Sequence, residues 1–120
     1  MRSRAPDFEA AVSFIPSDKG GRQNPARQGY RPDIHYDDDP PHQAWMVWPK
    51  FLDSNGTELP EGVAVPAMCN ANFYIVNEKL RSEVHAQHLR VGVPFSLVEG
   101  ARVVASCIVT KLLSIANNAA

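Results

Sequence analysis

Hydrophobic and polar residues alternate with a period of two along much of the chain. In the segment 8–15, Phe8, Ala10, Val12 and Phe14 would share one face of an extended strand. Similar alternation recurs in the segments 30–36, 80–85 and 93–97. This pattern predicts short β-strands at all four places and gives almost no sign of helix.

Two more apolar segments add to the predicted strands. The segment 103–115 is rich in Val and Ile, and its composition predicts a strand buried on both faces. The segment 44–52 predicts a further strand. Glycine, proline and aspartate interrupt the chain at 19–21, 39–42, 53–56, 59–62 and 99–100. Short strands at fairly regular spacing predict an all-β barrel or sandwich, and closure into a barrel would leave few sheet edges open to aggregation.

Length and composition are those of one small globular domain. The chain has 120 residues, of which 44% are hydrophobic and 21% charged, and a formal net charge of -1. We expect a flexible N-terminus at 1–6, a single barrel domain at 7–115 and a disordered tail at 116–120.

Several features favour a cytoplasmic location. The basic start of the chain is not followed by an apolar run, because Pro6, Asp7 and Glu9 interrupt it. No apolar stretch reaches the roughly 20 residues that span a bilayer. Cys69 and Cys107 are too few for a disulfide framework, so we expect two reduced thiols, at least one of them buried.

Four groups of short motifs lie in a fixed order along the chain. They are FEAAV at 8–12; GGR at 20–22 with Pro25 and GYRP at 29–32; DSNGT and ELPEGV at 53–63; and EGARVV at 99–104 with IVTKL at 108–112. In this order they resemble the third, C-terminal domain of elongation factor Tu, over residues 8–113. The resemblance implies a small closed antiparallel Greek-key β-barrel.

The resemblance also implies candidate contact residues. In that family the barrel packs against the GTPase domain and the second barrel, and one flank touches the T-stem of aminoacyl-tRNA. Arg22 and the Glu99–Gly100 turn match family positions near the T-stem, whereas Asp33 replaces a glutamine and Asn55 a threonine. The candidate RNA- or partner-binding residues are Arg22, Gln23, Arg27, Arg31, Asp33, Asn55, Glu99 and Gly100.

Charge favours a protein partner over RNA. Six basic and three acidic side chains lie in residues 1–31, and four aspartates follow within residues 33–39. Both signs close together suit a protein better than a polyanion, since RNA-binding domains are usually basic overall. Asp33 would also repel phosphate where the family's amide can donate a hydrogen bond.

An insertion of about a dozen residues relative to the family predicts an extended hairpin at about 37–52. It contains Trp45, Trp48 and Phe51. These aromatics form a protein contact patch in one interpretation, because Trp is enriched at interface hot spots. In the other, which we favour, they cap the barrel and shield faces that the missing domains cover in the family, since exposed apolar patches are uncommon in monomers.

The sequence carries no catalytic signature. It has no Gly-x-x-x-x-Gly-Lys-Ser/Thr loop, so we expect no GTPase activity, and no Gly-x-Ser-x-Gly elbow. A metal site at His35, Asp37–Asp39 and His42 is disfavoured because Pro40 and Pro41 make a loop there. His85 and His88 would align on a helix but not on the predicted strand. We therefore expect no enzyme activity, cofactor or metal.

Three functions remain open. The first is a protein-interaction module linked to translation, which docks onto or mimics the elongation factor barrel. The second is direct binding of tRNA or another structured RNA through Arg22, Arg27, Arg31 and the turn at Glu99. The third is a structural barrel that forms an oligomer.

Overall fold

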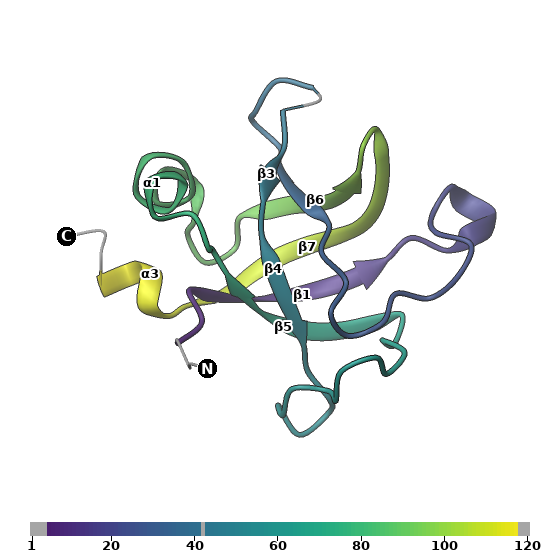
Figure 1. The fold of residues 1–120 in the computed structure, drawn as a ribbon. Helices are drawn as coiled ribbons and strands as arrows, with labels where there is room; N and C mark the ends of the chain where they lie inside the picture. The colour runs from purple at the N-terminus through teal and green to yellow at the C-terminus, as the bar shows by residue number, and fades with distance from the viewer. Residues whose placement is uncertain (1–4, 42, 118–120) are drawn as a thin grey trace.

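The computed structural model describes residues 5–41 and 43–117, and it is mostly β (Figure 1). Seven antiparallel strands form one curled sheet in the order β3-β2-β6-β7-β1-β5-β4. The strands are β1 (Phe8–Phe14), β2 (Asp33–Tyr36), β3 (Trp45–Met46), β4 (Trp48–Phe51), β5 (Met68–Tyr74), β6 (Pro94–Glu99) and β7 (Arg102–Leu112). The helical segments are η1 (Ser17–Lys19), α1 (Glu78–Leu80), η2 (Arg81–His85), α2 (Ala86–His88) and α3 (Ser114–Asn117). None of them has the length and apolar character that a bilayer-spanning helix needs.

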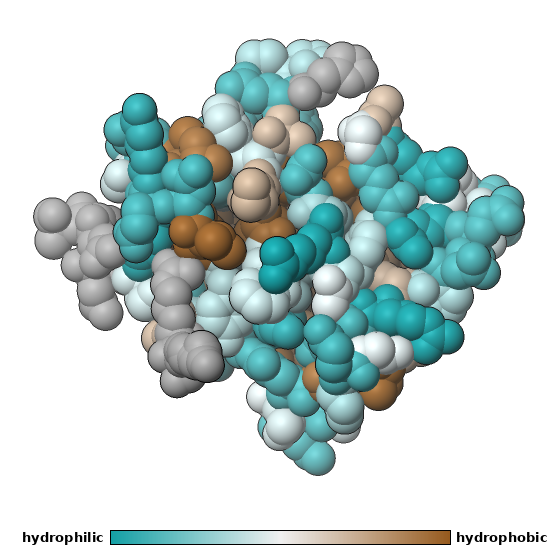
Figure 2. Space-filling model, in the orientation of Figure 1, coloured by the Kyte–Doolittle hydropathy of each residue, from teal (hydrophilic) through white to brown (hydrophobic). Residues whose placement is uncertain are grey.

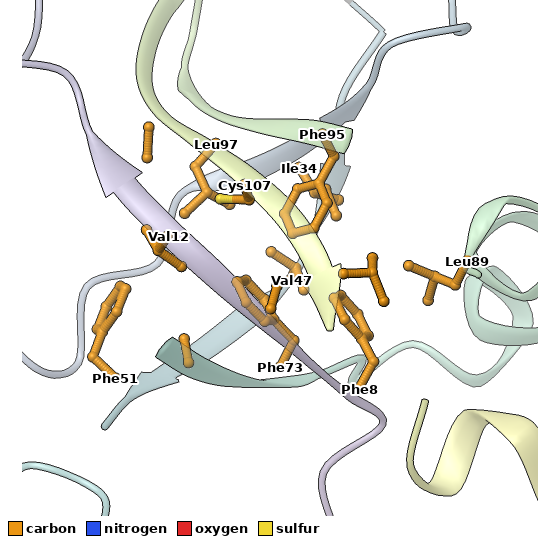
Figure 3. Packing of buried hydrophobic residues seen from close by; sticks show 14 of the residues in the cluster. Phe8, Val12, Ile34, Val47, Phe51, Phe73, Leu89, Phe95, Leu97 and Cys107 are labelled. Carbon is orange, nitrogen blue, oxygen red and sulfur yellow. The ribbon is translucent and has the colours of Figure 1, made fainter. Parts of the chain in front are cut away.

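The predicted alternation in β1 is confirmed. Phe8, Ala10 and Val12 are buried, and Phe8 lies opposite Phe73 in the register with β5. The rings of Phe8 and Phe73 stack with centroids 4.8 Å apart, and Phe95 meets both rings edge-on. Figure 3 shows these side chains pointing from their strands into one shared cluster. The concave face of the sheet therefore builds the core.

The two outermost strands of the sheet are consecutive in the chain. β3 pairs with β2 at one edge and β4 pairs with β5 at the other, and only Val47 separates β3 from β4. Val47 is 1% exposed and belongs to the core. The segment 45–51 thus runs from one edge strand of the sheet directly into the other. It lies within the predicted insertion at 37–52, whose first part forms the turn between β2 and β3, apart from residue 42, which is outside the described residues.

The strand predicted at 80–85 is wrong, because residues 78–88 are helical. The side chain of Asn77 caps the helix and accepts a hydrogen bond from the Leu80 backbone N–H at 3.0 Å. Arg81, His85 and Leu89 are buried. The spacing of four residues places Arg81 and His85 on one helical face, which the sequence hides because both are polar, and Leu89 follows directly after the helix.

The strand predicted at 103–115 exists, but its end and its burial differ from the prediction. β7 ends at Leu112, and it is buried on one face instead of two. Val103 and Ile108 are 43% and 52% exposed, whereas Val104 and Val109 are buried. Antiparallel sheets commonly keep one solvated face, so a Val- and Ile-rich strand need not be buried on both sides. The expected tail begins within α3, and residues 1–4 and 118–120 lie outside the described residues.

Candidate functional site

Arg22 and Glu99, two of the predicted contact residues, meet although they are far apart in sequence. Arg22 Nη1 and the Tyr30 hydroxyl both donate to Glu99 Oε2, and the Arg22 guanidinium lies 4.6 Å from the centroid of the Tyr30 ring. Burial opposes ionisation of Glu99, but the hydrogen bonds from Tyr30 and Arg22 outweigh it and hold the pKa of Glu99 below its ordinary value. Burial and the bond to Glu99 raise the pKa of Tyr30. The cluster is thus an ion pair that a ring and a hydroxyl hold in place.

The turn after η1 positions Arg22. Gly20 has φ 95°, a left-handed conformation that glycine adopts without strain. A Cβ on Gly21 would lie 1.9 Å from the backbone oxygen of Ile15, so only glycine fits there. These two glycines fold the chain tightly back against the end of β1, which places the next side chain beside the β6–β7 turn.

A pocket opens next to this ion pair. It has a volume of about 310 Å³ and includes the predicted residues Arg22 and Gln23. Its apolar walls include Phe14, Ile15, Pro25, Val65 and Val104. An open pocket with apolar walls and a polar rim suits an inserted side chain of a partner.

Arg31 and Trp48 form a second cluster at the protein surface. The Arg31 guanidinium lies 4.1 Å, and Lys50 Nζ 4.6 Å, from the centroid of the Trp48 ring. Tyr74 flanks the indole with centroids 6.1 Å apart. Trp48 and Lys50 are half-buried and alternate in β4 with the buried Pro49 and Phe51. Two cations therefore sit on one aromatic ring at the protein surface.

The other predicted aromatics are structural. Phe51 is fully buried in the core, so its prediction as an interface residue is wrong. Alternation along β4 turns it inward. Trp45 packs against the core, and its Nε1–H donates to Asp39 Oδ2 at 3.0 Å. Among the three aromatics, only Trp48 belongs to a cluster of surface cations.

The remaining predicted residues do not join either cluster as side-chain partners. Arg27 Nη1 donates to the Gly62 carbonyl at 3.0 Å. Asn55 sits in the 53–57 turn and lines a separate groove of about 750 Å³ with Met68 and Asn70. Asp33 is exposed and pairs through its backbone with β3 and β6, and Gly100 forms the β6–β7 turn with φ 57°. The predicted set is therefore spread over several surfaces.

Sequence reasoning missed two buried polar networks. In the first, Asp7 accepts from Arg81 Nε at 2.6 Å and from Ser114 Oγ at 3.0 Å. In the second, the Tyr36 hydroxyl lies 2.6 Å from His85 Nδ1. His88 stacks on Tyr36 and lies 3.3 Å from Asp39. The helical spacing of Arg81 and His85 was the available signal, but each network depends on contacts with residues that are distant in the sequence.

These networks do not form a recognisable metal centre. Within residues 5–41 and 43–117, no three His, Cys, Asp or Glu side chains gather in a way that could hold an ion. His42, which belongs to the metal site that the sequence disfavours, lies outside the described residues. The expected thiols are confirmed: Cys69 and Cys107 are both free, and Cys107 is buried.

The geometry is that of an antiparallel β protein with two polar–aromatic clusters on its surface. No known protein-family model matches the chain.

Replacing Tyr30 by Phe should lower the free energy of unfolding by about 1 kcal/mol, because Glu99 loses one of two donors. The pKa of Glu99 should rise, since that hydrogen bond helps to depress it. Urea unfolding of Y30F measures the first effect. In an E99Q background the same change should cost clearly less, and an equal cost in both backgrounds would show that the hydrogen bond contributes nothing.

Proposed function

We propose that this chain is a non-catalytic protein-binding module, built on a closed Greek-key barrel like the third domain of elongation factor Tu and working in the cytoplasm on a partner linked to translation. The contiguity of β3 and β4, which pair with opposite edges of the sheet, supports closure. The ordered motifs at 8–12, 20–32, 53–63 and 99–112 support the likeness to the factor. Two free thiols fit a reducing compartment.

One observation carries the choice of a protein partner. The cation at Arg22, which the resemblance places near RNA, is paired with Glu99 beside an apolar-walled pocket. A neutralised guanidinium is a poor ligand for phosphate, whose binding depends on unpaired cations that displace counterions. An apolar pocket with a polar rim suits a protein side chain. The tRNA alternative would require Arg22 to exchange Glu99 for phosphate.

A photo-cross-linking residue at Gln23 tests this proposal. With cytosolic extract we expect one discrete protein adduct, identified by mass spectrometry and absent when the cross-linker replaces Lys79. Gln23 lines the pocket near η1, whereas Lys79 is exposed on α1, on the opposite side of the molecule (Figure 1). Ala67→Trp, which fills the mouth of the pocket from an exposed position, should abolish the adduct.

Other outcomes select the alternatives. An adduct with a second copy of the chain, together with a dimer in light scattering, would replace the proposal with the structural barrel. Filter binding of aminoacyl-tRNA at low salt that weakens with salt and with Arg22→Glu would replace it with RNA binding.

A further inference from the structure

Trp48 makes contacts at the protein surface that the packing of the core does not explain. Trp48 is half-buried, and its Nε1–H is buried with no acceptor among the described residues. Leaving a buried donor unpaired costs stability, so neither the N–H nor deep packing explains a tryptophan there. The part of Trp48 that makes polar contacts is the face of its ring, because the Arg31 guanidinium and Lys50 Nζ lie 4.1 and 4.6 Å from its centroid.

Lys50 and Arg31 differ in whether a carboxylate of this chain pairs with them. Lys50 Nζ lies 3.8 Å from Glu61 Oε2, and the Glu61 side chain is 69% exposed. A pair with a separation this long and one exposed partner contributes little stability and separates easily. Arg31 is exposed and has no carboxylate partner in the part of the chain that the structure describes. Stacking on the indole fixes its planar guanidinium while leaving its N–H donors available.

We infer that Arg31, Trp48 and Lys50 bind an acidic segment of a partner protein, with one carboxylate on the Arg31 fork and a second displacing Glu61 from Lys50. Arg–carboxylate recognition is bidentate and gains from a guanidinium held in place, because less side-chain entropy is lost on binding. The inference names the chemistry of a partner and so rests on the proposed function, but it concerns a cluster separate from the pocket at Gln23.

The surrounding surface favours charge recognition over apolar docking. On the side that carries β4, Figure 2 shows mostly hydrophilic side chains, with hydrophobic areas that are small and separate. A partner helix that docks through an apolar face would need a continuous apolar stripe on this surface. A nucleic acid would meet the carboxylates of Glu58 and Glu61, which lie beside Tyr74 and Lys50 respectively. An acidic peptide meets the same two glutamates, but its flexible side chains can direct single carboxylates onto Arg31 and Lys50 and away from Glu58 and Glu61.

Calorimetry with a synthetic peptide of eight glutamates tests the inference, with an octaglutamine peptide as the matched ligand. We expect the glutamate peptide to bind and to shift the Trp48 indole N–H signal in NMR more than that of Trp45. Arg31→Gln should weaken binding at least tenfold, and Arg31→Lys should weaken it less. Glu61→Gln should tighten binding two- to threefold, which a purely structural role for this cluster would not produce. Arg90→Gln, an exposed change outside the cluster, should leave the affinity unchanged.

Equal binding of the glutamine peptide, or an Arg31→Gln protein that binds as well as wild type, would overturn the inference. Tighter binding of duplex RNA that displaces the peptide would overturn it in favour of a nucleic acid. A failure here, with the Gln23 adduct intact, would leave the proposed function standing, because the adduct reports on the pocket alone.

Discussion

Arg81→Met should lower the free energy of unfolding by about 3–5 kcal/mol, because it leaves the Asp7 carboxylate buried without its cation. Both side chains are almost completely buried, at 5% and 0% exposed, and Arg81 Nε lies 2.6 Å from Asp7 Oδ1. The other oxygen of Asp7 accepts from the Ile75 backbone N–H at 2.8 Å. A domain of this size is stable by only about 5–15 kcal/mol, so the variant should be close to unfolding at 37 °C.

Urea denaturation followed by circular dichroism measures this loss. Arg90→Met is the matched control, since Arg90 is exposed and the same change should alter stability by less than about 0.5 kcal/mol. Combining Asp7→Asn with Arg81→Met should cost less than the sum of the two single changes, because the double variant no longer buries an unpaired charge. A loss below about 1 kcal/mol for Arg81→Met would contradict the ion pair's role.

The same ion pair shows why the pattern of residues 80–85 favours a strand although the segment is helical. Arg81 is buried only because Asp7, 74 residues earlier, supplies a partner. Read along the sequence, an arginine in the interior of a domain is improbable, and the alternation of Leu80, Ser82 and Val84 then favours a strand. Asn77, whose side chain caps the helix, is the local sign of a helix start in this part of the sequence.

Other features were within reach of the sequence. The strands β1 and β6 follow from alternation, because their buried residues are apolar and need no distant partner. Alternation in 48–51 would also have turned Phe51 inward, since Trp48 and Lys50 occupy the opposite face of β4. The pairing of Arg22 with Glu99 could not follow from sequence, because it depends on how the β6–β7 turn meets the loop after η1.

His85 should make the protein sensitive to acid. Burial, and to a lesser extent the neighbouring His88, lower the pKa of His85 to about 4, against the opposing influence of Asp7 and Asp39. The Tyr36 hydroxyl lies 2.6 Å from Nδ1, and Nε2 is buried with no hydrogen-bond partner among the described residues, so a charged ring, which donates from both nitrogens, would leave one buried N–H without an acceptor. The folded protein therefore keeps this ring neutral at a pH where the unfolded chain, with a histidine pKa of about 6.5, already binds a proton.

The stability that His85 confers is thus fully present above about pH 6.5 and is lost as the pH falls toward 4, with about 2 kcal/mol lost between pH 7 and pH 5. Urea midpoints at the two pH values measure it. The double variant Tyr36→Phe with His85→Leu removes both hydrogen-bonding partners and should lose this part of the acid sensitivity, because no buried group is left to titrate there. His35→Gln, which leaves both partners in place, should keep it. An unchanged acid shift in the double variant would show that other groups cause the effect.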